Sequence, residues 1–224
     1  MKDAKLIIWG CGGMGREIAA LCEILGRDVI GFLDERIEMH GQIIDDVPVL
    51  GDIADIAKYR HEAEIICSGV GEPALKRKFV RKTREAGLQI ASPLIHPSVH
   101  VPPSSRIGVS SILCAGTIIS INVNIGNFVI VNTNVTLAHD VSISDYCTIS
   151  PGVNISGNVT VEEGAFIGTG SAIREKVSIG AWSMVGGGSF VKNDVPPQVL
   201  YAGVPAVYKK TRAWPHNESP CDKQ

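Results

Sequence analysis

The sequence predicts a two-part α/β protein, in which a small domain with a parallel sheet precedes a parallel β-helix. Buried strands alternate with helical patterns up to about residue 92, and from Ile95 onward aliphatic residues recur at every sixth position. Aromatic residues form only 5% of the chain, which suits a narrow interior of stacked aliphatic side chains. We expect domains at residues 1–92 and 93–208 and a polar tail at 209–224.

The N-terminal part alternates strand and helix patterns. Strands are expected at Leu6–Trp9, Val29–Leu33 and Ile65–Cys67, and helices at Gly15–Leu25, Ile53–Tyr59 and Pro73–Ala86. This βαβαβ order corresponds to one half of a Rossmann-type fold, with parallel strands joined by right-handed crossovers.

The second part is a run of hexads that continues without a gap from Ile95 to Val191. Such repeats are typical of parallel β-helices, in which like residues stack in columns. We expect the aliphatic first position to point inward and the small or β-branched fifth position to pack near a corner. Glycine is frequent at the second position, and we expect Gly or Asn to permit positive φ at the corners.

Charge, hydropathy and cysteine usage exclude several classes of protein. The net charge of −2 gives no basic footprint for nucleic acid, and no apolar run reaches the roughly 20 residues of a spanning helix. The six cysteines are scattered without metal-ligand spacing, and the N-terminus does not resemble a signal peptide. We therefore expect a cytoplasmic protein with reduced thiols, no metal, and no nucleic-acid or membrane partner.

Six short motifs carry a resemblance to a known family. They are Gly10–Glu17, Asn132–Thr133, His139–Asp140, Gly157–Val159, Gly186–Gly188 and Ala202–Ala206. In this order, the chain resembles the sialic acid O-acetyltransferase-like sugar acyltransferases, a group of hexapeptide-repeat enzymes that includes the N-acetyltransferases of the bacillosamine pathway. The resemblance implies a left-handed β-helix with three hexads per coil, acetyl-CoA as co-substrate, and a homotrimer with active sites between protomers.

His139 is the candidate general base. It is the sole histidine between residues 101 and 200, and it lies at the third, outward-facing position of its hexad. Imidazole suits the removal of a proton from an attacking amine or hydroxyl near neutral pH. The resemblance assigns the adjacent acid, Asp140, to orienting the ring, although the family carries the longer glutamate there.

Three further residues of the β-helix match positions of the family's active site. Gly157 follows His139 by three hexads, so it should stack beside it one coil later. The resemblance implies that the Gly157 N–H meets the thioester carbonyl, that Gly187 lines the CoA channel, and that Asn132 lines the acetyl and acceptor site. Glycine and asparagine at the last two positions also fit β-helix corners without any ligand.

The N-terminal glycines form a candidate nucleotide site. Gly10, Gly12 and Gly15 satisfy a GxGxxG pattern, with Gly13 inside it and Asp34 at the end of the second strand. A domain of one half-Rossmann unit favours the pyrophosphate of a nucleotide sugar over NAD, and the resemblance implies the same. The glycines also fit a purely structural role in helix–strand packing.

Four further positions complete the expected acceptor site, and two of them depart from the family. Asp34 and Glu35 should then lie near the base and the ribose. The bacillosamine-pathway enzyme carries histidines where this chain has Met14 and Thr148. These differences leave the sugar open.

The resemblance therefore implies an acetyl-CoA-dependent acetyltransferase acting on the amine of a nucleotide-linked sugar, of the UDP-4-amino-4,6-dideoxy type, in surface-glycan precursor synthesis. One alternative is an O-acetyltransferase of sialic acid or another sugar hydroxyl. Another is a non-catalytic nucleotide-binding or solenoid scaffold, although outward threonines form no extended ladder. A γ-class carbonic anhydrase is disfavoured, because it needs three zinc-binding histidines.

Overall fold

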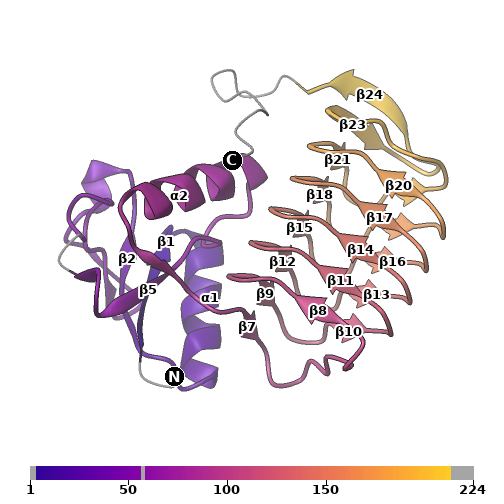
Figure 1. Ribbon diagram of the computed structural model, residues 1–224. Helices are drawn as coiled ribbons and strands as arrows, with labels where there is room; N and C mark the ends of the chain where they lie inside the picture. Colours follow the sequence, from indigo (N-terminus) through magenta and orange to yellow (C-terminus); the bar gives the residue numbers. More distant parts are fainter. Residues whose placement is uncertain (1–3, 57–58, 213–224) are drawn as a thin grey trace.

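The computed structural model describes residues 4–56 and 59–212. Its N-terminal α/β part lies beside a solenoid of stacked coils (Figure 1). This arrangement confirms the predicted fold class, a Rossmann-like half domain followed by a left-handed parallel β-helix. No helix in the described ranges is long and apolar enough to cross a membrane.

The N-terminal part contains a four-stranded parallel sheet in the order β2-β1-β5-β6. Its strands are β1 (Lys5–Trp9), β2 (Val29–Leu33), β5 (Ala63–Ile66) and β6 (Gln89–Ile90), and its helices are α1 (Gly13–Ile24) and α2 (Pro73–Glu85). Because β1 lies between β2 and β5, the glycine loop that follows it opens at the carboxyl edge of the sheet. Chain order reverses there, which is where ligands bind in folds of this type.

The connection from β2 to β5 differs from expectation. The described residues 53–56 of the predicted helix Ile53–Tyr59 form turns instead. Aspartate side chains compete for the backbone there, since Asp52 Oδ1 accepts from Ala54 N at 2.8 Å and Asp55 Oδ2 accepts from Asp52 N at 2.9 Å. A 3₁₀ turn η1 (Ile37–Met39) and a short hairpin of β3 (Ile43–Ile44) and β4 (Val47–Pro48) occupy this connection.

The solenoid is built from two-residue strands that pair in parallel with the strand one coil later. The first face holds β7 (Leu94–Ile95), β9 (Ile112–Leu113), β12 (Ile130–Val131), β15 (Thr148–Ile149), β18 (Phe166–Ile167) and β21 (Met184–Val185). The second holds β10 (Ile118–Ile119), β13 (Thr136–Leu137), β16 (Asn154–Ile155), β19 (Ala172–Ile173) and β22 (Phe190–Val191). The third holds β8 (Arg106–Ile107), β11 (Asn124–Ile125), β14 (Ser142–Ile143), β17 (Thr160–Val161) and β20 (Ser178–Ile179).

Positive φ falls at the fourth hexad position, where asparagine and glycine adopt it as predicted. Examples are Asn122, Asn134, Gly116 and Gly152, and Asp140 adopts it too. The second-position glycines have another cause: a Cβ on Gly108 would lie 2.4 Å from the carbonyl carbon of the residue one coil later. Close stacking of coils, rather than a left-handed backbone, therefore accounts for the glycine at this position.

The two parts share a core. Ile112 and Ile130 occupy outward positions of the first face, yet both are fully buried together with Leu6 and Ile8 of the N-terminal sheet. Their burial removes apolar surface from water in both parts at once, which stabilises this relative placement.

A lysine reinforces this junction. Lys76 of α2 is completely buried, and its Nζ donates to Cys147 O and to Thr148 Oγ1, each at 2.8 Å. Burial lowers the pKa of Lys76 to about 7, and the charge of Glu72 offsets only part of the loss of hydration.

The last coil is closed by β23 (Val199–Ala202), with which β24 (Val207–Thr211) pairs antiparallel. The boundary expected after residue 208 thus falls inside β24, because these residues cover the open edge of the solenoid. Residues 213–224 of the expected tail lie outside the described residues.

The lowered pKa of Lys76 should make the free energy of unfolding depend on pH. The unfolded chain binds the Lys76 proton up to the ordinary lysine pKa, and the folded chain releases it from about pH 7. Stability should therefore rise with pH above 7 by up to about 1 kcal/mol per pH unit relative to Lys76→Met. Denaturant unfolding at pH 7, 8 and 9 measures this, with the exposed Lys192→Met as control. Parallel pH profiles for wild type and Lys76→Met would contradict it.

Candidate active site

The corner between the second and third faces carries His139 and Asp140. The His139 side chain is 54% exposed, and its Nδ1 lies 2.8 Å from Asp140 Oδ2. A carboxylate only accepts hydrogen bonds, so Nδ1 carries the hydrogen in the neutral ring. Nε2 therefore carries the lone pair and can take a proton.

Asp140 is held from two sides. Its backbone is left-handed, with φ of 60°, a conformation that Asp tolerates better than most residues. Its Oδ1 accepts a hydrogen bond from Asn122 Nδ2 at 3.1 Å, one coil earlier. The hydrogen bond with His139, followed by that from Asn122, lowers the pKa of Asp140, so this carboxylate stays ionised beside the ring.

Gly157 lies directly beside the His139 ring, as its spacing predicts. A Cβ at this position would be 2.5 Å from His139 Cε1 and 2.6 Å from Nε2. Gly157 is absent from the positive-φ positions, so the imidazole, and not the backbone, excludes a side chain here. Within the described residues the Gly157 N–H donates no backbone or side-chain hydrogen bond, which leaves a donor free next to Nε2.

Asn132 and Gly187 lie at a different corner, between the first and second faces. Asn132 is buried and its Nδ2 donates to Ile149 O at 3.1 Å, whereas Gly187 is exposed. The width of the second face separates both residues from His139. A single chain therefore does not bring the five predicted β-helix site residues together.

Thr148 belongs to the junction rather than to the His139 corner. It is almost fully buried on the first face, under the N-terminal part. Its hydroxyl donates to Gly71 O at 2.7 Å and accepts from Lys76 Nζ. Lys76 was not identified from the sequence, because a single lysine in a strongly basic helix gives no signal of burial.

The four glycines of the loop fall into two pairs, one that the fold requires and one that it does not. Gly10 has φ of 107°, and a Cβ on Gly15 would lie 1.9 Å from Gly10 O, so the fold requires glycine at both positions. Gly12 and Gly13 are exposed, have no left-handed φ, and would place a Cβ in open space. Met14 is half-buried and packs against the core beneath the loop.

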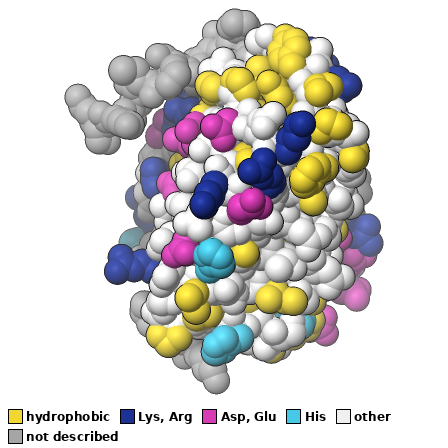
Figure 2. Space-filling model, turned by 90° about the vertical axis from the view of Figure 1, so that its right-hand side faces the viewer, with side chains coloured by type: hydrophobic (Ala, Val, Ile, Leu, Met, Phe, Trp, Pro, Cys, Tyr) yellow, Lys and Arg dark blue, Asp and Glu magenta, His cyan; other side chains and the backbone are white. Residues whose placement is uncertain are grey.

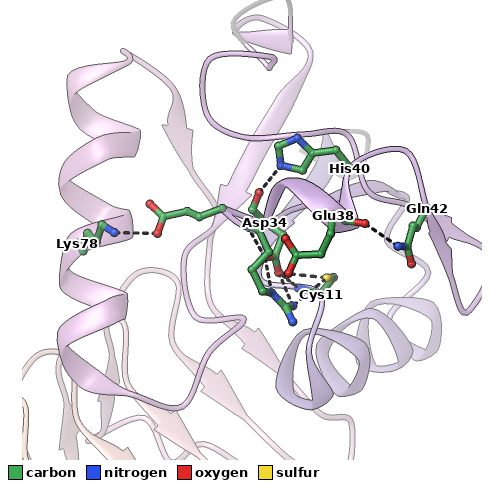
Figure 3. A network of polar contacts seen from close by, with 8 residues as sticks. Cys11, Asp34, Glu38, His40, Gln42 and Lys78 are labelled. Atoms are coloured by element: carbon green, nitrogen blue, oxygen red, sulfur yellow. Dashed lines mark hydrogen bonds and ion pairs between the residues drawn. The ribbon is translucent and has the colours of Figure 1, made fainter.

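Asp34 ends β2 beside this loop, as predicted, but its carboxylate is already occupied (Figure 3). Arg36 donates to Oδ1 from Nε at 2.8 Å and to Oδ2 from Nη2 at 2.9 Å, and Cys11 donates from its thiol at 3.1 Å. Burial alone would raise the pKa of Asp34, but the hydrogen bonds from Arg36 and Cys11 hold it well below its usual range. Burial and Asp34 in turn raise the pKa of the Cys11 thiol to about 11, so this thiol remains a donor.

Glu35 points to α2, where Lys78 Nζ lies 2.7 Å and Lys82 Nζ 2.5 Å from its two carboxylate oxygens. Partial burial would raise the pKa of Glu35, but these lysines lower it. Neither Arg36 nor the two lysines were identified from the sequence. Arg36 could have been identified from the sequence, because it follows Asp34, the acid at the end of the strand, by only two residues.

No group of three or more His, Cys, Asp or Glu side chains that could hold a metal occurs in the described part of the chain.

The comparisons with known proteins agree with this architecture. The family model described as the PglD N-terminal domain matches residues 5–83. A variant of perosamine N-acetyltransferase from Caulobacter crescentus, in complex with CoA and GDP-perosamine, is 31% identical over 92% of this chain and 97% of that chain, with a TM-score of 0.85. The search of curated proteins found no match.

Two further solved structures are similar over the same share of this chain. The acetyltransferase domain of PglB from Neisseria gonorrhoeae, in complex with acetyl coenzyme A, is 28% identical over 92% of this chain and 100% of that chain, with a TM-score of 0.82. WeeI from Acinetobacter baumannii is 26% identical over 92% and 100% of the two chains, with a TM-score of 0.81. The chain belongs to the hexapeptide-repeat sugar acyltransferase family.

Proposed function

We propose that this protein transfers an acetyl group from acetyl-CoA to the amine of a nucleotide-linked amino sugar. The observation that carries the proposal is the His139 corner, where an open base nitrogen, an ionised carboxylate and a free backbone N–H meet. The similar perosamine N-acetyltransferase was crystallised with CoA and a GDP-linked amino sugar, and the similar PglB domain with acetyl coenzyme A.

The residues of this corner suit acyl transfer. His139 Nε2 takes a proton from the acceptor amine as its nitrogen forms a bond to the thioester carbon. The Gly157 N–H donates to the carbonyl oxygen as negative charge develops there. The carbon–sulfur bond then breaks, and the protonated ring returns a proton to the CoA sulfur. Asp140 stabilises the imidazolium between these two transfers.

The site is completed by a second copy of the chain, in a homotrimer. Asn132 and Gly187 occupy one corner of the solenoid, and His139 occupies another. A complete site therefore combines the His139 corner of one protomer with the Asn132 and Gly187 corner of its neighbour. Large apolar side chains are exposed around the second face: Ile118 is 62%, Ile121 57% and Phe190 38% exposed. Figure 2 shows apolar groups gathered over the last coils on the side turned away from the N-terminal part.

The glycine loop is the site for the pyrophosphate of the nucleotide. Gly12 and Gly13 have no structural need to be glycine, but their missing side chains leave the backbone N–H groups at the start of α1 open to an anion. Glycine at both positions is thus explained by close approach of a ligand.

Removal of the base should abolish transfer. We expect His139→Ala to lower kcat by about 10²–10⁴-fold, while KM for acetyl-CoA changes little, because the ring acts on the amine proton. Release of the CoA thiol measures the rate, with GDP- and UDP-linked 4-amino-4,6-dideoxy sugars and CMP-sialic acid as acceptors. His96→Ala removes another surface imidazole and serves as control.

Gly157→Ala sharpens this test, because its methyl group would displace the ring without removing it. This variant should lose activity with almost unchanged stability, since the ring end is exposed and can move. Equal rates for wild type and His139→Ala would refute the role of the base. Turnover with a hydroxyl acceptor alone would keep the base and change the substrate.

Mixed assemblies should reveal the shared site. His139→Ala and Gly187→Leu should each be inactive alone, because the first lacks the base and the second fills the expected CoA groove. Dissociation and joint reassembly should restore part of the activity, since some sites would then combine an intact His139 with an intact Gly187. Sedimentation checks that both variants form trimers. An active monomer at assay dilution would contradict the shared site.

Alanine substitutions at the loop glycines should distinguish an effect on nucleotide binding from an effect on folding stability. Gly13→Ala should leave stability unchanged or raise it by up to about 1 kcal/mol, because alanine restricts the unfolded chain, and it should weaken nucleotide binding. Gly15→Ala should instead destabilise the fold through contact with Gly10 O. Thermal unfolding and calorimetric titration with GDP and UDP measure both effects. Unchanged nucleotide affinity in Gly13→Ala would argue against a pyrophosphate at this loop.

A further inference from the structure

Asp34 cannot serve as the ribose-binding acid of a Rossmann-type site. Such an acid at the end of the second strand normally accepts hydrogen bonds from ribose hydroxyls. Here Oδ1 accepts from N and Nε of Arg36, and Oδ2 accepts from Nη2 of Arg36 and from N and Sγ of Cys11. A carboxylate offers about four acceptor positions, so these donors leave none for a ligand.

The group presented to a ligand is therefore the guanidinium of Arg36. Its side chain is 54% exposed, although Asp34, which holds it, is buried. The Nε–Nη2 edge pairs with the carboxylate, which fixes the plane of the fork. Beyond that pairing, Nη1 has no partner within the described residues, and the second N–H of Nη2 has only the weak sulfur acceptor of Cys11, at 3.5 Å. The outer Nη1–Nη2 edge thus offers a ligand one unengaged N–H and, parallel to it, one N–H that is held only by this weak acceptor.

This outer edge lies beside the glycine loop. Cys11, which touches Arg36, directly precedes the exposed Gly12 and Gly13. A nucleotide with its pyrophosphate at these glycines would extend its base along the carboxyl ends of β1 and β2, toward Arg36. Lys78 and Lys82 both pair with Glu35, so neither lysine is the cation that contacts the base in place of Arg36.

Nucleobases differ in how they match two parallel donors. Guanine presents two acceptors, O6 and N7, on one open edge, which is the edge that arginine reads in pairs. Adenine and uracil each place a donor next to the acceptor. Cytosine has adjacent acceptors at N3 and O2, but O2 flanks the glycosidic bond, where the ribose crowds the approach.

We propose that Arg36, held by Asp34, recognises the O6–N7 edge of guanine, so that the acceptor is a GDP-linked sugar. This inference rests on the proposed nucleotide-sugar site, and it replaces the UDP type that the sequence resemblance suggests. Arg36 is thereby a specificity-determining residue outside the His139 corner.

Calorimetric titration of the full chain with GDP, UDP, CDP and ADP tests this proposal. We expect the wild type to bind GDP at least about tenfold more tightly than the other three nucleotides. Arg36→Lys keeps the charge beside Asp34 but loses the fork, and should reduce affinity for GDP by about tenfold while changing UDP less than about twofold. Arg36→Met should give the same loss of preference, and Arg81→Met, which removes an arginine paired with Glu85 on α2, should not.

The outcomes separate this inference from the function on which it rests. Equal or tighter binding of UDP, CDP or ADP by the wild type would overturn guanine recognition and leave the nucleotide-sugar site in place. Equal weakening of all four nucleotides in Arg36→Lys would overturn it too, because the fork would then contact a phosphate. Failure of all four to bind would overturn the nucleotide site itself.

Discussion

The stacking of each residue on the residue one coil later is the constraint on which the rest of the structure depends. Parallel pairing aligns Ile with Ile and Val with Val along the solenoid axis, so a core without large rings closes completely. The same register acts on the surface. It lays His139 over Gly157 and Asn122 against Asp140, so the candidate active site is assembled from the third and fourth hexad positions of coils that stack on one another.

Most of the solenoid could be predicted from the sequence, because its period is local and repeats without interruption. Counting hexads was enough to place Gly157 beside His139. The same count would have found Asn122, but asparagine is common at β-helix corners and gave no separate signal. The second-position glycines were misread, since a sequence does not distinguish a left-handed backbone from a close approach between coils.

Contacts between the two parts could not be predicted. The buried amine of Lys76 and the buried outward residue Ile130 both depend on segments that are distant in sequence. The turns at residues 53–56, where a helix was expected, have a local cause, since Asp52 and Asp55 accept hydrogen bonds from backbone N–H groups there. Helix propensity and hydrophobic periodicity do not reveal this competition between side-chain and helical hydrogen bonds.

The core shared by the N-terminal sheet and the first face has a consequence for acceptor choice. With Ile112 and Ile130 buried against Leu6 and Ile8, the glycine loop and the solenoid keep a set separation. If the diphosphate binds this loop as proposed, the substrate has to span from a loop in fixed position to the His139 corner of the proposed trimer with its own length. The number of bonds between diphosphate and amine would then be a criterion of selection, independent of contacts to the sugar.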